Sequence, residues 1–171
     1  MAPVVIIVGA PGAGKSSVGR RVAHQLKVPF ADSDVLVEKR AGKPVSDIFI
    51  SDGEEIFRAW EHEEIIEALA NFDGVLSLGG GAILDPKTRQ ALSDHCVVWL
   101  EVDLTNATQR VGMNSSRPLL LGNVRGTMLS MLEQRTPLYE EVADHRVETS
   151  GRPIKDVVDD VTAAVRASDH D

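Results

Sequence analysis

Residues 9–16 carry the sequence GAPGAGKS and directly follow the apolar run Val4–Val8. The spacing G-x-x-x-x-G-K-S is typical of a loop whose backbone N–H groups surround the phosphates of a nucleotide. The positive end of a following helix strengthens such a site. Lys15 is expected to reach the β- and γ-phosphates, and Ser16 to ligate the accompanying Mg²⁺. The alternative is a chance glycine-rich turn, which would need neither the strand before it nor the helix after it.

Two aspartates follow a second apolar run, Pro29-Phe30-Ala31, at the predicted end of a strand. Because side chains alternate along a strand, Asp32 and Asp34 are expected on the same side of it. One carboxylate could then face the magnesium ion while the other receives a hydroxyl proton. The alternative is that Asp34 or Ser33 only caps the helix that starts there.

Three consecutive glycines, Gly79, Gly80 and Gly81, follow a third apolar run over residues 75–78. Glycine permits positive φ angles and leaves backbone N–H groups open to a ligand. We therefore expect a small molecule to lie against this backbone. A plain turn is the alternative, since glycine clusters also terminate strands.

Arg58, Arg117 and Arg135 are widely spaced along the chain. In an α/β topology all three can point toward the carboxyl ends of the strands, where ligands bind. A guanidinium group binds carboxylate or phosphate through two parallel hydrogen bonds. Taken singly, each could instead be a solvated or salt-bridged surface arginine.

A charged helix is predicted over about residues 54–70, opened by the capping-box pattern S-x-x-E that ends at Glu54. Glu54, Arg58 and Glu61 recur at helical spacing, so they share one face, with Phe57 beside them. The sequence therefore predicts a charged helix face flanked by an aromatic ring.

Residues 112–126 lose the helical period and contain three glycines, a proline and small polar residues. A loop of this length in a small nucleotide-binding domain is either a disordered decoration or a mobile lid over the active site, and its length favours the lid. Arg117, directly before Pro118, could swing in to neutralise phosphate charge during transfer.

Apolar runs alternate with segments of helical period, which predicts parallel strands joined by crossover helices. The expected fold class is α/β, a three-layer α/β/α sandwich with a parallel sheet of about five strands, in one domain over residues 1–171. Strands are expected near residues 4–8, 29–31, 75–78, 96–102 and 146–148. Helices are expected near residues 14–27, 34–42, 54–70, 127–144 and 154–167.

A formal net charge of −8 argues against nonspecific binding to nucleic acid or to an anionic membrane surface. No apolar stretch approaches the ~20 residues of a membrane-spanning helix, and the N-terminus lacks a secretory pattern, so a cytoplasmic protein is expected. A monomer is expected because no surplus apolar stripe demands a partner. The single cysteine, Cys96, is expected to act as a small buried hydrophobe.

Together, in this order and at these spacings, the motifs resemble those of the shikimate kinase family. The resemblance covers nearly the whole chain and implies a P-loop fold like that of the nucleoside monophosphate kinases. It also implies transfer of the γ-phosphate of ATP to the 3-hydroxyl of shikimate. The matching segments are the phosphate loop, Asp32-Ser33-Asp34, DGEEIFR ending at Arg58 with Glu61, SLGGG over 77–81, Arg117-Pro118-Leu119, and Arg135-x-Pro137-Leu138-Tyr139.

For the acceptor, the resemblance implies that Arg58 and Arg135 bind the shikimate carboxylate. Asp34 would orient the attacking hydroxyl, either as a true base or only as an orienting group. The acceptor segment spans about residues 34–61. The full set implied for shikimate is Asp34, Phe49, Phe57, Arg58, Glu61, Gly79, Gly80, Gly81 and Arg135.

For the nucleotide, the resemblance implies that Lys15 and Arg117 act on the phosphates during transfer, and that Asp32 reaches the Mg²⁺ ion of Ser16 through water. Arg110 and Arg152 match the family's arginines beside adenine, although residues 147–153 depart from the family's usual pattern around the base. The full set implied for ATP is Gly12, Ala13, Gly14, Lys15, Ser16, Ser17, Arg110, Arg117 and Arg152.

Two alternatives remain at this point. A related small-molecule kinase, such as a gluconate kinase, would share the phosphate loop and the sheet, but it accounts less well for Asp34, Arg58 and the triple glycine occurring together. The other alternative is a nucleotide-binding regulatory module that has lost catalysis. Such a module would not need all of Lys15, Ser16, Asp32, Asp34 and Arg117.

Overall fold

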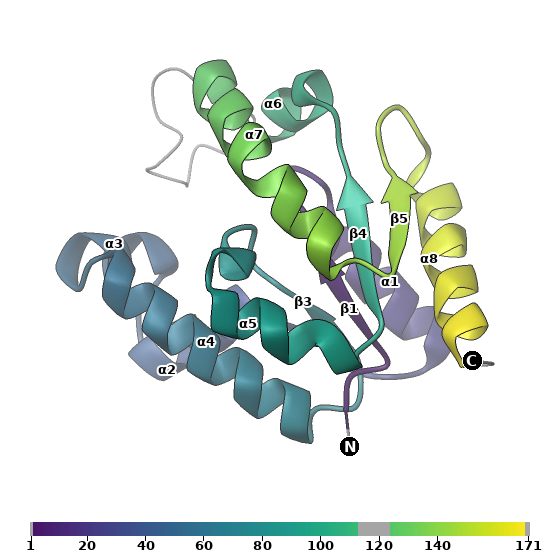
Figure 1. Ribbon diagram of the computed structural model, residues 1–171, viewed down its shortest axis with the longest axis horizontal. Coiled ribbons are helices and arrows are strands. Elements are labelled where there is room, and N and C mark those ends of the chain that lie inside the picture. The colour runs from purple at the N-terminus through teal and green to yellow at the C-terminus, as the bar shows by residue number, and fades with distance from the viewer. Residues whose placement is uncertain (1, 113–123, 170–171) are drawn as a thin grey trace.

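The computed structural model describes residues 2–112 and 124–169, and its described strands form one parallel sheet (Figure 1). The sheet has five strands in the order β2-β3-β1-β4-β5, which confirms the predicted α/β class. The strands are β1 (Val5–Val8), β2 (Phe30–Asp32), β3 (Val75–Ser77), β4 (Val97–Glu101) and β5 (His145–Glu148).

The central strand β1 explains why the sheet forms where it does. All four of its residues are buried, and Ile6 pairs with Leu76 of β3 on one side and Val97 of β4 on the other. A continuous apolar run suits a strand covered on both faces, because neither set of alternating side chains then meets water. The strand ends directly at the phosphate loop, so the core of the fold fixes where that loop begins.

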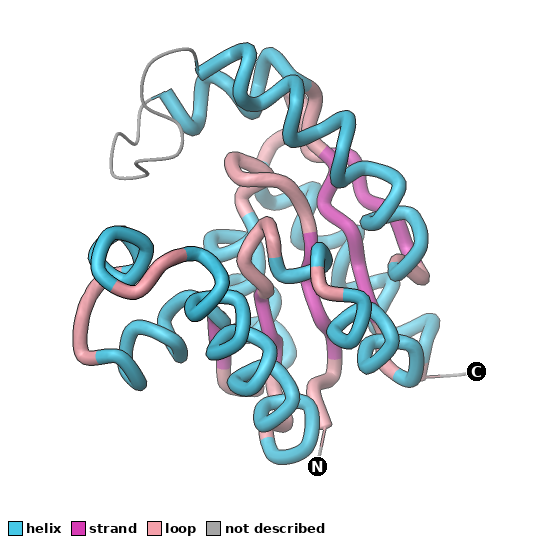
Figure 2. Tube along the Cα trace, turned by 60° about the vertical axis from the view of Figure 1, so that its left-hand side comes forward, coloured by secondary structure: helices cyan, strands magenta, loops and turns pink. Residues whose placement is uncertain are grey.

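Helices cover both faces of this sheet (Figure 2). Helices α1 and α8 pack against each other on one face, whereas α5 and α7 lie over the other (Figure 1). The predicted three-layer arrangement is therefore confirmed. The helices are α1 (Lys15–Leu26), α2 (Ser33–Ala41), α3 (Val45–Ser51), α4 (Glu54–Asn71), α5 (Pro86–Ala91), α6 (Leu104–Gly112), α7 (Val124–Val142) and α8 (Ile154–Ser168), with 3-10 helices η1 (Ala82–Leu84) and η2 (Leu92–Asp94).

The helix after the phosphate loop, α1, buries Val18, Val22 and Ala23 along one face, as its spacing predicts. It starts from Gly14, which has φ +86°. Such a backbone conformation favours glycine. The turn aims the first amides of α1 back toward the end of β1, where an anion would bind.

One capping prediction is wrong, and the predicted set of helices is incomplete. The short helix α3 was not expected, and the capping box at residues 51–54 does not form: Ser51 ends α3, and its hydroxyl donates to the Asp47 carbonyl at 2.7 Å. Helix α4 instead begins after Gly53, whose φ of +89° reverses the chain without a side-chain cap. The S-x-x-E pattern was present, but the preceding helix had already engaged its serine. Helices α5 and α6 were also absent from the predicted set.

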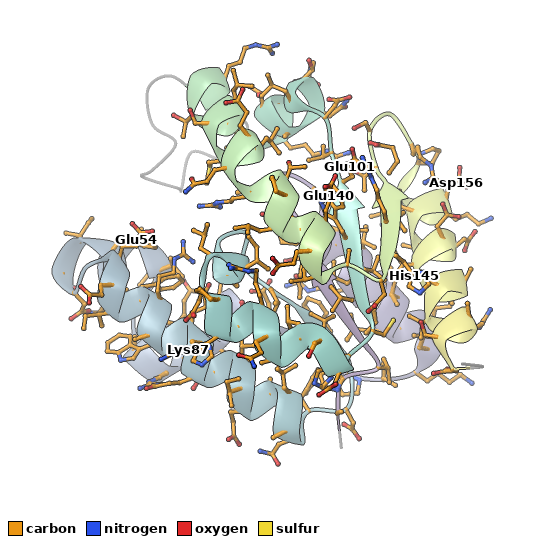
Figure 3. All side chains as sticks on the ribbon, viewed as in Figure 1. Glu54, Lys87, Glu101, Glu140, His145 and Asp156 are labelled. Carbon is orange, nitrogen blue, oxygen red and sulfur yellow. The ribbon has the colours of Figure 1, made fainter. Side chains whose placement is uncertain are left out.

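Charged side chains lie on the outer surfaces of the helices, as Glu54, Lys87, Glu140 and Asp156 illustrate (Figure 3). Cys96 packs partly buried against the core, and its burial raises the pKa of the thiol, in line with the predicted small hydrophobe. Within residues 2–112 and 124–169, no helix combines the length and the apolar character that crossing a membrane requires.

Candidate active site

The phosphate loop joins β1 to α1 and is closed by glycines in conformations that other residues rarely adopt. Gly12 and Gly14 both have φ near +86°, and an added Cβ at Gly12 would lie 2.9 Å from the Ala107 carbonyl oxygen. Lys15 lies across the loop, and its Nζ donates to the carbonyls of Gly9 at 2.8 Å and Ala10 at 3.1 Å. The Lys15 ammonium group therefore lies beside the start of the phosphate loop, at the edge of the cavity described below.

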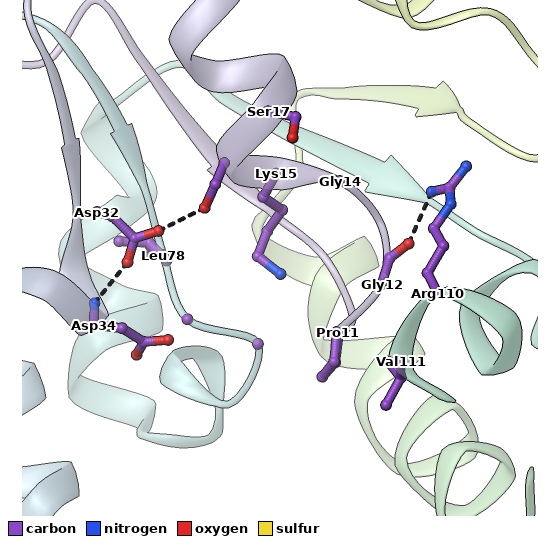
Figure 4. A pocket seen from close by; sticks show the side chains of 13 residues that line it. Pro11, Gly12, Gly14, Lys15, Ser17, Asp32, Asp34, Leu78, Arg110 and Val111 are labelled. Carbon is purple, nitrogen blue, oxygen red and sulfur yellow. Dashed lines mark hydrogen bonds between the residues drawn. The ribbon is translucent and has the colours of Figure 1, made fainter. Parts of the chain in front are cut away.

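The end of β2 faces this loop and carries Asp32. One of its carboxylate oxygens accepts from the Ser16 hydroxyl at 2.8 Å, and the other accepts from the Asp34 backbone N–H at 2.8 Å (Figure 4). Asp32 is thus the N-cap of α2. A hydroxyl and a carboxylate oxygen meet beside the phosphate loop, and these are the ligand types that Mg²⁺ prefers.

The placement of Asp34 differs from the prediction. Strand β2 ends at Asp32, and Asp34 lies in the first turn of α2 rather than on the strand. The alternative that Asp34 or Ser33 caps the helix is also wrong, because Asp32 does so. Ser33 is fully buried and accepts from the Gly79 N–H at 2.8 Å, which ties the start of α2 to the triple glycine.

A first cavity lies between the phosphate loop, the end of β2 and α6. Asp34 and Lys15 both point into it (Figure 4). Arg110 closes the α6 side, donating to the Gly12 carbonyl at 2.8 Å. Of the residues predicted for the nucleotide, those that line this cavity are Gly12, Gly14, Lys15, Ser16, Ser17 and Arg110.

Two described residues predicted for the nucleotide, Ala13 and Arg152, do not line this cavity. Ala13, within the loop, is buried in the core. Arg152 donates to the Glu148 carbonyl at 2.8 Å and forms an ion pair with Asp160 at 2.8 Å. Arg117 and most of the predicted lid lie outside the described residues.

A second cavity opens beside the first and contains the residues predicted for the acceptor. The two cavities share Pro11, Asp34, Gly79 and Gly80, so a molecule in one would lie against a molecule in the other. The second cavity is lined by Pro11, Asp34, Val45, Phe49, Phe57, Arg58, Glu61, Gly79, Gly80, Gly81, Met131 and Arg135. Pro11, Val45 and Met131 were not predicted for the acceptor. Met131 lies one helical turn before Arg135, and this spacing could have identified it.

Arg58 is held by its neighbours on α4. Its Nη1 donates to Glu61 Oε1 at 2.8 Å, and its guanidinium carbon lies 5.2 Å from the centre of the Phe57 ring. Glu61 is only 2% exposed, and burial raises the pKa of its carboxyl to about 7 in spite of the opposing effect of Arg58. The arginine head is thereby fixed at the cavity wall.

The triple glycine is needed for space rather than for backbone conformation. Among the described glycines with positive φ, none is Gly79, Gly80 or Gly81, so that part of the expectation is wrong. A Cβ on Gly79 would lie 2.6 Å from Asp34 Oδ1, and one on Gly81 would overlap Arg58 Nη2. Side chains of the site occupy the positions where these Cβ atoms would stand.

Arg135 enters the second cavity from α7 and is 8% exposed. Burial lowers the pKa of its guanidinium, but arginine keeps its proton at neutral pH. Two arginines thus face one small cavity whose described wall also carries Asp34. Such a pair can bind a carboxylate, while Asp34 can accept a hydrogen bond from a hydroxyl.

The sequence profile of shikimate kinases matches residues 11–166. The chain belongs to the shikimate kinase family. The shikimate kinase of Thermobifida fusca is 51% identical over 148 residues, which cover 86% of each chain. That of Salinispora arenicola is 48% identical over 167 residues, covering 98% of this chain and 100% of the relative.

Solved structures agree with the shikimate kinase family. The shikimate kinase from Acinetobacter baumannii in complex with shikimate has a TM-score of 0.92 at 32% identity, covering 98% of this chain and 94% of that one. A gluconokinase from Sinorhizobium meliloti has a TM-score of 0.57 at 19% identity, a likeness of fold alone. The chain is therefore an ATP-dependent kinase of the shikimate kinase family, and the gluconate kinase and non-catalytic alternatives are not favoured.

Proposed function

We propose that this protein transfers the γ-phosphate of ATP to the 3-hydroxyl of shikimate, as the family resemblance implies. The observation that carries this proposal is the common wall of the two cavities, with Lys15 on one side and Arg58 and Arg135 on the other. A small carboxylated alcohol held by the two arginines would present a hydroxyl across Asp34 to a bound triphosphate. Phosphoryl transfer requires mainly such positioning and stabilisation of charge.

On the donor side, the backbone amides of residues 12–17 would surround the phosphates. The Lys15 ammonium, now hydrogen-bonded to two loop carbonyls, would turn to the β- and γ-phosphates when these enter. Arg110 would lie on the α6 side of the nucleotide. Arg152 would reach adenine only by giving up its ion pair with Asp160.

A magnesium ion fits the pairing of Ser16 with Asp32. Mg²⁺ takes oxygen ligands, keeps several waters and is usually bound through one or two carboxylates together with substrate phosphates. We propose that Ser16 ligates it directly and that Asp32 does so through water. When bound, the ion neutralises charge on the β- and γ-phosphates.

On the acceptor side, Arg58 and Arg135 would bind the shikimate carboxylate, and Glu61 would keep Arg58 in place. Phe49 and Phe57, whose ring centres lie 4.8 Å apart, would flank the carbocyclic ring. Asp34 would orient the attacking hydroxyl and accept its proton as the bond to phosphorus forms. Gly80 and Gly81 would offer their backbone to the ring hydroxyls, since the Gly79 N–H is already bonded to Ser33.

An assay of ADP release with a panel of acceptors tests this function. With ATP and Mg²⁺ present, we expect turnover with shikimate and little with quinate, gluconate or no acceptor. Chelating the metal should abolish the shikimate-dependent rate. Equal rates with and without shikimate would contradict the proposal. A higher rate with gluconate would show that gluconate, not shikimate, is the substrate.

A further inference from the structure

We propose that Tyr139 is a positioning residue for the acceptor: its hydroxyl holds the Gly80 carbonyl and so fixes the triple-glycine wall of the acceptor cavity relative to the phosphate loop. The proposal rests on the proposed function, because it gives Tyr139 a task only if the second cavity holds a carboxylated acceptor.

Tyr139 is the one tyrosine of the chain and is 1% exposed. Its O–H donates to the Gly80 carbonyl oxygen at 2.6 Å, across 59 residues of sequence. Its ring stacks on Trp99 of β4, with ring centres 5.9 Å apart. The packing fixes the ring, so the hydroxyl has a defined direction.

Tyr139 lies one helical turn after Arg135 on α7, so the tyrosine and the arginine expected to bind the acceptor share one face of that helix. Burial raises the pKa of Tyr139 to about 12, so the phenol keeps its proton at neutral pH and can donate it to the Gly80 carbonyl. The bond therefore ties the helix that carries Arg135 to the triple glycine.

Gly80 lies between the two cavities. A Cβ on it would be 2.9 Å from Pro11 Cδ, so its backbone packs directly against the phosphate loop. Because the peptide unit is planar and trans, anchoring the Gly80 carbonyl also directs the Gly81 N–H the opposite way. The hydroxyl of Tyr139 thus fixes the peptide unit between Gly80 and Gly81 in the wall of the acceptor site.

The test replaces Tyr139 by phenylalanine, which keeps the ring and its stacking but removes the hydroxyl. We expect kcat/KM for shikimate to fall about three- to tenfold, mainly through KM, with the Kd for ATP unchanged. Thr162→Val is the matched control: Thr162 is also buried and donates to a backbone carbonyl at 2.9 Å, but on α8. It should leave both KM values unchanged. Unchanged kcat/KM for shikimate in Tyr139→Phe would overturn the proposal. An equal loss of ATP affinity and of shikimate affinity would overturn it as well.

A second variant separates this proposal from the proposed function. If the second cavity holds the acceptor carboxylate, Arg135→Lys should raise KM for shikimate and leave the Kd for ATP unchanged. If Arg135→Lys does not change KM for shikimate, the assignment of the second cavity to the acceptor fails. If Arg135→Lys raises this KM and Tyr139→Phe does not, only the positioning role of Tyr139 fails.

A measurement on the otherwise unaltered protein covers the case in which Tyr139→Phe does not fold. Because the chain has one tyrosine, 3-fluorotyrosine labelling yields a single ¹⁹F resonance. Shikimate should shift that resonance and ADP should leave it in place. A resonance unmoved by saturating shikimate would overturn the proposal.

Discussion

Glu61 accepts a hydrogen bond from Arg58 through Oε1, at 2.8 Å, while its Oε2 has no hydrogen-bond partner among the described residues. Both oxygens lie in a site where the carboxylate is almost wholly removed from water. Removal from water disfavours the charged form, and the nearby Asp34 adds to this effect. Arg58 therefore faces a carboxyl group that titrates near neutrality.

This raised pKa predicts a specific dependence of stability on pH. The folded protein keeps the Glu61 proton up to about pH 7, whereas an unfolded chain loses it near 4.5. The stabilising contribution is therefore complete below pH 4.5 and is lost as the pH rises through 7. We expect this carboxyl to lower the free energy of unfolding by on the order of 2–3 kcal/mol across that window.

Denaturant unfolding from pH 4.5 to 8 measures the effect, with Glu61→Gln as the variant that cannot titrate. Glu61→Gln should lose less stability across the window than the unaltered protein. Glu54→Gln is the matched control, because Glu54 also lies near Arg58, at 3.6 Å, but is exposed at the start of α4 (Figure 3). Parallel curves for Glu61→Gln and the unaltered protein would contradict the prediction.

The second prediction concerns Arg58→Ala. Removing a charged hydrogen-bonding partner of the acceptor should lower kcat/KM for shikimate about 100-fold. The Kd for ATP should stay near that of the unaltered protein. The fold should survive, because Glu61 can remain protonated once its positive neighbour is gone. Steady-state kinetics and ATP titration measure the two effects.

Arg40→Ala provides the comparison. Arg40, on α2, pairs with Glu63 of α4 at 2.6 Å and lies over the Trp60 ring, but it lines neither cavity. Its removal should leave kcat/KM for shikimate and the Kd for ATP unchanged. Loss of ATP binding with retained shikimate binding in Arg58→Ala would show that Arg58 belongs to the other half of the site.

Arg117→Ala tests the residue that the family resemblance places in the lid. If Arg117 stabilises charge on the transferring phosphoryl group, turnover should fall about 100-fold or more while the Kd values for both substrates change little. Arg125→Ala, an exposed arginine on α7, is the control. Unchanged turnover in Arg117→Ala would remove it from the catalytic residues.

The sequence could predict the features that local chemistry determines. The phosphate loop follows from its glycine spacing, and the sheet follows from continuous apolar runs such as Val5–Val8. Asp32, Asp34, Arg58 and Arg135 were expected together because parallel strands bring their carboxyl ends to one edge. The role of each site residue toward ATP or shikimate stays a prediction.

Other features depend on contacts between distant segments and could not be found this way. Strand β2 ends at Asp32 and α2 begins at the next residue, so Asp32 is the cap and Asp34 is a helical residue. No spacing rule indicates that Tyr139 reaches the Gly80 carbonyl. The triple glycine suggested unusual φ angles, whereas the structure needs room for Asp34 and Arg58.

The two outer glycines of that segment allow a paired prediction. Gly81→Ala places a methyl group against the Arg58 guanidinium, so Arg58 must move. Gly79→Ala places one 2.6 Å from Asp34 Oδ1, so the carboxylate must move instead.

Overpacking of this kind costs about 1–3 kcal/mol, enough for a roughly tenfold or larger change in the affected step. Gly81→Ala should therefore raise KM for shikimate, whereas Gly79→Ala should lower kcat. The two variants control for each other, because a general loss of packing would change both parameters alike. Indistinguishable kinetics in the two variants would show that Arg58 and Asp34 do not divide binding and catalysis between them.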